Sequence, residues 1–313
     1  MKADSVTADL HVESANSKAR TNESTHAEEL QSEDLLALPD LFKEPATRRP
    51  SAWTRMTAVW WRHWIGVRST LIANALPACA EPILFLAAIG LGLGQYITQS
   101  IGGLPFGAWM GAGVLAMTAM WTASFETTYG TFVRMVYQKT YAAMIVTPVT
   151  VRDAFLGELL WCGTKGFAFT TIVCLVFVGF GSLSGWLPYL SWTILFIPVV
   201  GFVAAVLFGA IGMIVTSQIQ NLNNYNFYWT GLLTPMTFFS GMLFPASDLP
   251  PGLEQVAYVL PLFHVTELNR LLLFGDSPER VVDWVVGCAI YLLVLTPIAV
   301  ALAVRLLRRR VQA

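Results

Sequence analysis

The chain has 313 residues, of which 55% are hydrophobic and 12% are charged, and its mean hydropathy is +0.57. A water-soluble domain of this size needs far more charge to cover its surface, so the composition excludes an ordinary soluble protein. Apolar runs at about 71–94 and 284–304 are near the length that crosses a bilayer core. The sequence therefore predicts an integral membrane protein.

Residues 1–47 form an acidic N-terminal segment. They contain ten acidic against four basic residues, a net charge of −6, whereas the remainder has ten acidic against fifteen basic residues, a net charge of +5. The segment is rich in Ser, Thr, Asn and Glu, so it cannot bury enough apolar surface to order itself. It also lacks the basic start and apolar stretch of a secretory signal. We expect a disordered cytoplasmic extension or, alternatively, a docking segment for a partner.

Residues 48–69 are predicted to form an amphipathic helix on the membrane surface. Four tryptophans alternate with three arginines at helical spacing in the string WTRMTAVWWRHWIGVR, which covers residues 53–68. Indole rings beside guanidinium groups suit the headgroup layer of a bilayer.

Residues 70–313 are predicted to be an all-α membrane domain with six transmembrane helices. The expected spans lie at about 70–95, 106–132, 154–180, 187–216, 226–244 and 282–305. In this arrangement thirteen arginines and lysines fall on one side of the membrane, against Arg270 and Arg280 on the other. The excess of basic residues in cytoplasmic loops then places both termini in the cytoplasm, and an odd number of spans would break this agreement.

Motifs of several function classes are absent from the sequence. There is no G-x-x-x-x-G-K-[ST] loop to hold the phosphates of ATP, no G-x-S-x-G and no H-E-x-x-H. The four histidines are too few for a histidine-rich metal centre, since two lie in residues 1–47. The four cysteines lie in apolar stretches without metal-ligand spacing and are predicted to be core residues. We therefore expect no enzyme activity, metal or cofactor on this chain.

Charged residues in or near the predicted spans should face protein or water, and three of them are candidates for a translocation path or a conformational switch: Glu81, Glu126 and Arg134. Glu81 precedes a proline that kinks its helix, so its carboxyl is either a hydrogen-bonding group between helices or a polar point of a substrate path. Glu126 is expected to face the bundle interior and to pair with Arg134 two turns later, as a structural pair or as a switch. Glu158 and Lys165 lie seven residues apart on one helical face and are expected to form an interfacial salt bridge or a snorkelling pair near the cytoplasmic end of the third span.

The polar segment 134–159 separates the second and third spans. It contains a short helical stretch, then Thr147-Pro148, then a helix start capped by Thr150 with Asp153 at its third position. The short helix is either a plug into a cytoplasmic partner or an ordinary loop.

The apolar stretch 238–275 is broken by prolines into pieces too short to cross a bilayer. We expect re-entrant or interfacial helices there, in the region of Pro245, Pro250, Pro251, Pro261 and Glu267.

Three strings give the chain a resemblance to a known family. They are Glu81-Pro82, SFETTYGTFVRMVYQKTYAAMIVTPVTVRDAFLGELLWCGTKG at 124–166, and TPMTFFSGMLFPASDLPPGLEQVAYVLPLFH at 234–264. With them, the chain from about residue 53 to its C-terminus resembles the permease subunits of type-2 ABC exporters, and within these the nodulation-protein-J group of lipo-oligosaccharide exporter permeases. The acidic segment 1–47 is not part of this pattern.

The resemblance implies an exporter in the inner membrane of a bacterium, built from two permeases, expected as a homodimer, and two copies of a separate ATPase subunit. ATP and Mg would bind to that partner, and no nucleic acid is implied. Segment 53–68 would be the family's connecting helix, and the pieces between Pro245 and Phe274 its re-entrant helices. The coupling helix received by the ATPase would include Gln138, Lys139, Thr140, Tyr141 and Ala142.

The substrate implied by the resemblance is an amphiphile, a lipo-oligosaccharide or a lipid-linked glycan, whose headgroup would meet Glu81 and Glu126. A permease for a hydrophobic drug or antibiotic is the alternative within the family, because a fold does not settle a substrate. An ion-coupled secondary carrier and a membrane enzyme are less favoured, since the chain shows no clear relay of ionisable groups and no internal repeat.

Overall fold

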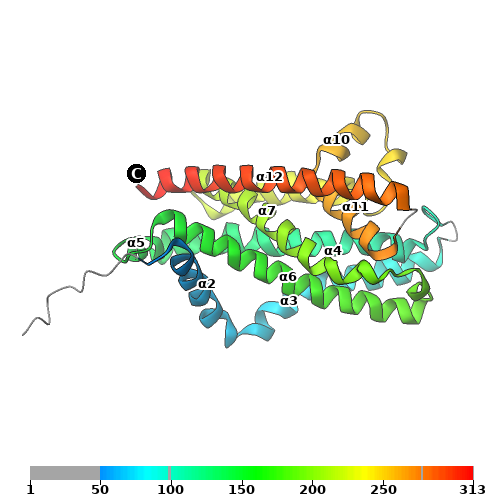
Figure 1. Ribbon diagram of the computed structural model, residues 1–313, viewed down its shortest axis with the longest axis horizontal. Helices are drawn as coiled ribbons and strands as arrows, with labels where there is room; N and C mark the ends of the chain where they lie inside the picture. The colour runs from blue at the N-terminus through cyan, green and yellow to red at the C-terminus, as the bar shows by residue number, and fades with distance from the viewer. Residues whose placement is uncertain (1–49, 98–99, 276–277, 313) are drawn as a thin grey trace, which may run out of the picture. The chain divides into compact units, whose positions relative to one another are not determined.

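The computed structural model describes residues 50–97, 100–275 and 278–312, and all regular structure within these ranges is helical (Figure 1). An isolated bridge between Ile101 and Leu104 is the sole β-type pairing among them. The acidic segment 1–47 lies outside the described residues, so the expectations for it stay predictions.

The first described helices are α2 (Ala52–Arg68) and α3 (Leu71–Phe85). The Ser51 side chain caps α2 by accepting from the amide of Thr54. Helix α3 contains Pro77 and Pro82 and continues into the π-helical η1 (Leu86–Gly92) and the 3-10 turn η2 (Leu93–Gln95).

The next segment contains the two helices at the centre of the fold. Helix α4 (Phe106–Phe125) continues into the π-helical η3 (Glu126–Gly130) and η4 (Val133–Tyr137), and the short α5 (Thr140–Ile145) follows. Helix α6 (Val151–Ser184) begins with a reciprocal capping box, in which Thr150 and Asp153 bond to each other's backbone amides. This cap was predicted from the sequence and is confirmed.

The C-terminal part consists of long helices separated by short ones. After η5 (Leu187–Tyr189) and η6 (Trp192–Phe196) come α7 (Ile197–Gln218), η7 (Leu222–Asn224), α8 (Tyr225–Tyr228), η8 (Trp229–Leu233) and α9 (Thr234–Phe239). The chain ends with η9 (Ala246–Asp248), α10 (Leu253–Val259), α11 (Pro261–Phe274) and α12 (Pro278–Gln312).

Helices α4, α6 and α7 pack against one another, and α12 lies alongside α7 (Figure 1). Eighteen of the twenty residues of α4 are buried, so this helix forms the centre of the described bundle. Glycines allow the close approach: a Cβ atom at Gly111 would lie 2.1 Å from the Phe177 ring. All four cysteines are buried and free, which confirms that they are core residues.

Among the described residues, four helical segments are long and apolar enough to cross a membrane, namely Leu71–Gly90, Val151–Ser184, Trp192–Gln218 and Val285–Val311. A fifth is formed if α10 and α11, bent by 77° at their junction, make one broken span. These helices do not confirm the predicted count of six. Helix α4, on the predicted second span, is rich in glycine and alanine, and the predicted fifth span is divided among α8, η8 and α9.

Gly166→Ala is expected to destabilise the bundle by about 1–3 kcal/mol. The added Cβ would lie 2.2 Å from the Cβ of Ala205, so α6 and α7 would have to move apart. The matched control is Gly179→Ala on the same helix, where no neighbouring atom lies within 4 Å. The midpoint of thermal unfolding in detergent should fall for the first variant only; equal shifts would contradict the close contact.

Candidate functional site

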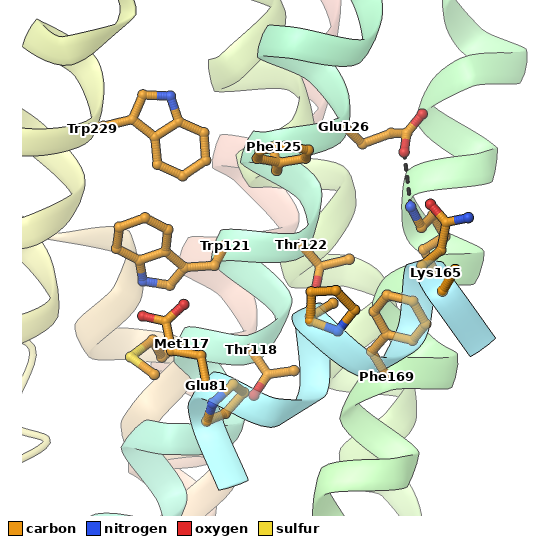
Figure 2. A pocket seen from close by; sticks show the side chains of 15 residues that line it. Glu81, Met117, Thr118, Trp121, Thr122, Phe125, Glu126, Lys165, Phe169 and Trp229 are labelled. Carbon is orange, nitrogen blue, oxygen red and sulfur yellow. Dashed lines mark hydrogen bonds and ion pairs between the residues drawn. The ribbon is translucent and has the colours of Figure 1, made fainter. Parts of the chain in front are cut away.

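A cavity of about 460 Å³ lies among α3, α4, α6 and η8 (Figure 2). Aromatic side chains form much of its wall: Trp121 and Phe125 come from α4, Phe169 from α6 and Trp229 from η8. The rings of Trp121 and Trp229 lie 5.0 Å apart. Figure 2 shows these two indoles on one side of the space and Phe169 on the other. Such walls suit an apolar or sugar-bearing ligand, with a few polar groups to orient it.

Helix α3 presents one face to this cavity. Asn74, Ala78 and Glu81 line it at the three- and four-residue spacing that places residues on one side of a helix. Pro77 and Pro82 also line it, and each lacks the amide that would bond a carbonyl four residues earlier. The carboxyl of Glu81 forms no ion pair within the described part of the chain. The prediction that Glu81 is a polar point of a cavity fits this position, and its role stays a prediction.

A cluster of four charged residues, one buried and three half-buried, lies at the edge of the cavity, and two of its members, Glu126 and Lys165, also line it. Glu126 accepts from Arg134 at 2.9 Å and from Lys165 at 2.8 Å. Arg134 also donates to Glu158, which is 1% exposed. Two carboxylates and two cations therefore neutralise one another across α4 and α6, as charges in a membrane protein must.

The predicted ion pair between Glu126 and Arg134 is present, but the prediction of a salt bridge between Glu158 and Lys165 is wrong. Seven residues of helix separate these two α-carbons by about 10 Å along the axis. Arg134 reaches Glu158 from the α4 side, and Glu126 reaches Lys165 in the same way. Each member of the expected pair thus has a nearer partner on another element.

Two π-helical turns, η3 and η4, carry the chain from Glu126 to Arg134 and beyond. Such turns widen the helix locally and recur at functional sites. Gly130 leaves room for the guanidinium, because a Cβ atom there would lie 3.1 Å from Nη2 of Arg134. The Thr131 hydroxyl also donates to Glu158 at 3.1 Å. The helix is thus distorted in the segment where Arg134 contacts both carboxylates.

The predicted coupling segment follows directly. Lys139 adopts a left-handed conformation (φ 49°) and starts α5, whose Thr140 is half-buried. Tyr141 is buried, packs its ring 4.8 Å from that of Phe155 and donates its hydroxyl to Glu158. Burial, together with the negative charge of Glu158, holds the pKa of Tyr141 well above its usual range, so the hydroxyl keeps its proton.

The rest of the coupling segment is open to solvent. Gln138, Lys139 and Ala142 are exposed beside the buried Tyr141. Segment 138–142 therefore has one anchored side chain and an accessible surface, as a helix that docks into a partner would need. Whether a partner binds there stays a prediction.

Helix α2 is held against α6 by side-chain contacts next to the charge cluster. Arg55 pairs with Asp153 at 2.6 Å, and the Trp60 indole donates to Thr164 at 2.9 Å. His63 stacks on Trp161, and burial lowers the pKa of His63 to about 4, so the ring is neutral at neutral pH. The sequence suggested a surface helix here but did not indicate these contacts, since each joins residues about a hundred positions apart.

The predicted re-entrant region forms α10 and α11 and lies apart from the cavity lining. Pro245 caps η9, Pro250 precedes α10 and accepts from two of its amides, Pro251 is exposed, and Pro261 is the first residue of α11. Glu267 pairs with Arg270, whose guanidinium lies 3.5 Å from the centre of the Trp109 ring and donates to Gly241 at 2.7 Å. This arginine therefore ties α11 to α4.

Among the sequence-predicted site residues, the structure brings Glu81, Glu126 and Lys165 to one cavity and places Arg134 and Glu158 beside it. Tyr141 is joined to this group through Glu158. Sequence reasoning missed the aromatic wall of Trp121 and Trp229, because nothing in one chain indicates that residues more than a hundred positions apart will face each other.

Comparison with known proteins agrees with the resemblance seen in the sequence. Residues 54–274 match the ABC-2 type transporter family. Nodulation protein J of Rhizobium leguminosarum bv. viciae is 34% identical over 263 residues, covering 83% of this chain and 96% of that protein. Nodulation protein J of Sinorhizobium fredii is 34% identical over 273 residues, covering 86% and 99%, and that of Azorhizobium caulinodans 26% identical over 224 residues, covering 71% and 85%. The chain therefore belongs to the ABC-2 type transporter family, as a membrane permease similar to Nodulation protein J.

Proposed function

We propose that this chain is the transmembrane subunit of an ATP-driven exporter in the bacterial inner membrane, working with a separate ATPase subunit. Two permeases and two ATPases would form the transporter, each permease crossing the membrane six times with both termini in the cytoplasm. ATP and Mg would bind to the ATPase, and this chain would carry the path of the substrate.

A continuous series of side-chain contacts is the main support for this proposal. It starts at the exposed surface of α5, passes from Tyr141 to Glu158 and Arg134, and continues through Glu126 to Lys165 in the cavity wall. Every link is a hydrogen bond or an ion pair between charged or buried groups, so movement of α5 must disturb the groups that border the cavity. This arrangement suits a device that transmits movement from a docked ATPase to a substrate space.

The residues that line the cavity favour an amphiphilic substrate, either a lipo-oligosaccharide or a lipid-linked glycan. Its aromatic wall offers faces for sugar rings and acyl chains, and Asn74, Thr118 and Glu81 offer polar contacts for a headgroup. The resemblance to lipo-oligosaccharide exporter permeases points to the same class. In proteoliposomes that contain both subunits, a lipo-oligosaccharide should stimulate ATP hydrolysis; stimulation by a hydrophobic drug alone would favour a drug exporter.

Affinity purification of the tagged chain in mild detergent from its native membranes should recover a near-equimolar ATPase subunit. The double variant Gln138→Glu/Ala142→Glu should reduce this recovery about tenfold or more, since it changes exposed residues of the coupling surface and leaves Tyr141 in place. The matched control, Ser182→Glu/Ser184→Glu, adds the same charge to exposed positions at the far end of α6. Recovery of the chain alone in every detergent, or equal loss in both variants, would contradict the proposal.

A further inference from the structure

One carboxylate in the wall of the aromatic cavity has no partner. Glu81 lines the cavity, and its carboxylate takes part in no hydrogen bond or ion pair among the described residues. The other two charged residues of the lining, Glu126 and Lys165, pair with each other at 2.8 Å. Figure 2 shows Glu81 on the side of the cavity where Trp121 lies, and Lys165 on the opposite side. The described lining thus holds one negative charge without an ion-pair partner.

Glu81 also lies at the middle of a candidate membrane span. Ten residues precede it and nine follow it in the 20-residue segment Leu71–Gly90. At the rise of an α-helix, about 14 to 15 Å separates Glu81 from either end, so its side chain cannot reach the water beyond the span. Charged groups at this depth face protein or a water-filled space, and one without a structural partner marks a functional site. The cavity is the space into which Glu81 opens.

The groups around this carboxylate suit a cation. Trp121 and Trp229 line the same cavity with ring centres 5.0 Å apart, and the face of an indole ring attracts positive charge. Thr118 donates its hydroxyl to the carbonyl of Val114 at 2.8 Å, so towards a ligand it acts as an acceptor. The cavity therefore offers a carboxylate, aromatic faces and an acceptor oxygen, and an ammonium group satisfies all three.

We propose that the cavity binds a protonated amino group of the exported amphiphile, between the carboxylate of Glu81 and the rings of Trp121 and Trp229. The inference rests on the proposed function, in which this cavity is the substrate space, and it narrows the class of substrate. An amphiphile whose headgroup carries an amine is preferred to a neutral one. An anionic headgroup, such as that of a phosphate-linked glycan, is disfavoured because it meets an unpaired carboxylate, while Lys165 is already engaged by Glu126.

The test measures binding to the purified full-length chain in nanodiscs of phosphatidylcholine, without an ATPase. Three amphiphiles share a dodecyl chain and a glucose ring, and carry an ammonium, a hydroxyl or a carboxylate group at the same position. Each is titrated below the concentration at which it forms micelles, by isothermal titration calorimetry, with empty nanodiscs as the blank. The ammonium form should bind at least about tenfold more tightly than the hydroxyl form, as expected for a hydrogen bond between charged groups, and the carboxylate form should bind most weakly.

Glu81→Gln should remove most of this preference, since glutamine keeps the shape of the side chain without its charge. Asp248→Asn is the matched control, because it removes an exposed carboxylate that does not line the cavity, and it should keep the preference. Equal binding of the ammonium and hydroxyl forms, or an unchanged preference in Glu81→Gln, would overturn the proposal. Tightest binding of the carboxylate form would assign the headgroup to Lys165 and would overturn it as well.

Failure of this inference can be told apart from failure of the proposed function. The preference among the three headgroups is measured on the unaltered chain without an ATPase, so it depends neither on the folding of a variant nor on the partner. Recovery of the ATPase without a preference for the ammonium form would leave the exporter in place and remove the headgroup assignment. The preference without recovery of an ATPase would keep the cation site and remove the exporter.

Discussion

Arg134→Gln is expected to lose most of its folded protein, with a destabilisation of about 3–5 kcal/mol. Arg134 is the shared partner of Glu126 and Glu158, and the carboxyl of Glu158 is 1% exposed. Without the guanidinium, Lys165 still neutralises Glu126, but Glu158 keeps a buried negative charge that has lost its ion-pair partner. The amount of monodisperse protein and its thermal midpoint in detergent measure this loss.

The double variant Arg134→Gln/Glu158→Gln separates charge balance from packing. It leaves Glu126 and Lys165 as one neutral pair, so it should recover much of the stability that Arg134→Gln loses. The exposed Arg68→Gln serves as a control for the removal of one arginine and should behave like the unaltered chain. A double variant no more stable than Arg134→Gln would show that the cluster is not held together by charge.

Tyr141→Phe is expected to fold and to retain the ATPase, yet to lower ATP-driven transport about tenfold. The phenylalanine ring keeps the packing against Phe155, but the hydrogen bond to Glu158 is lost. A hydrogen bond to a charged group contributes about 1.5–3 kcal/mol, which corresponds to roughly a tenfold effect or more. Transport of a fluorescent lipo-oligosaccharide into proteoliposomes, together with ATPase recovery, provides the measurement.

Tyr137→Phe is the matched control for this prediction. Tyr137 lies four residues earlier, and 65% of it is exposed, so the loss of its hydroxyl should leave transport unchanged. Full transport by Tyr141→Phe would remove the contact between α5 and Glu158 from the coupling route. Loss of ATPase recovery would instead assign Tyr141 to docking.

Features that depend on neighbours along the chain were predictable. The capping box of Thr150 and Asp153 involves residues three apart, and Glu126 and Arg134 lie eight residues apart in the successive helical turns η3 and η4. The apolar composition likewise indicated membrane helices, because a hydrocarbon core demands long apolar segments. In each case the physical cause acts within a few turns of one helix.

Contacts between helices were predictable only in part. Glu158 and Lys165 do lie on one helix, as predicted. Their spacing could not show that Glu158 would instead contact Arg134 and Tyr141, and that Lys165 would contact Glu126. A helical repeat states which side chains share a face and leaves open which element that face meets.

The sequence by itself determined that this is a helical membrane protein, because hydropathy acts along each segment, and its resemblance to a known family pointed to the ABC-2 type. Only the tertiary structure decided which charges pair, where the cavity lies and how α5 reaches it. Those features depend on how α3, α4, α6 and α12 approach one another, and that approach follows from close packing of small residues and from the need of each buried charge for a partner.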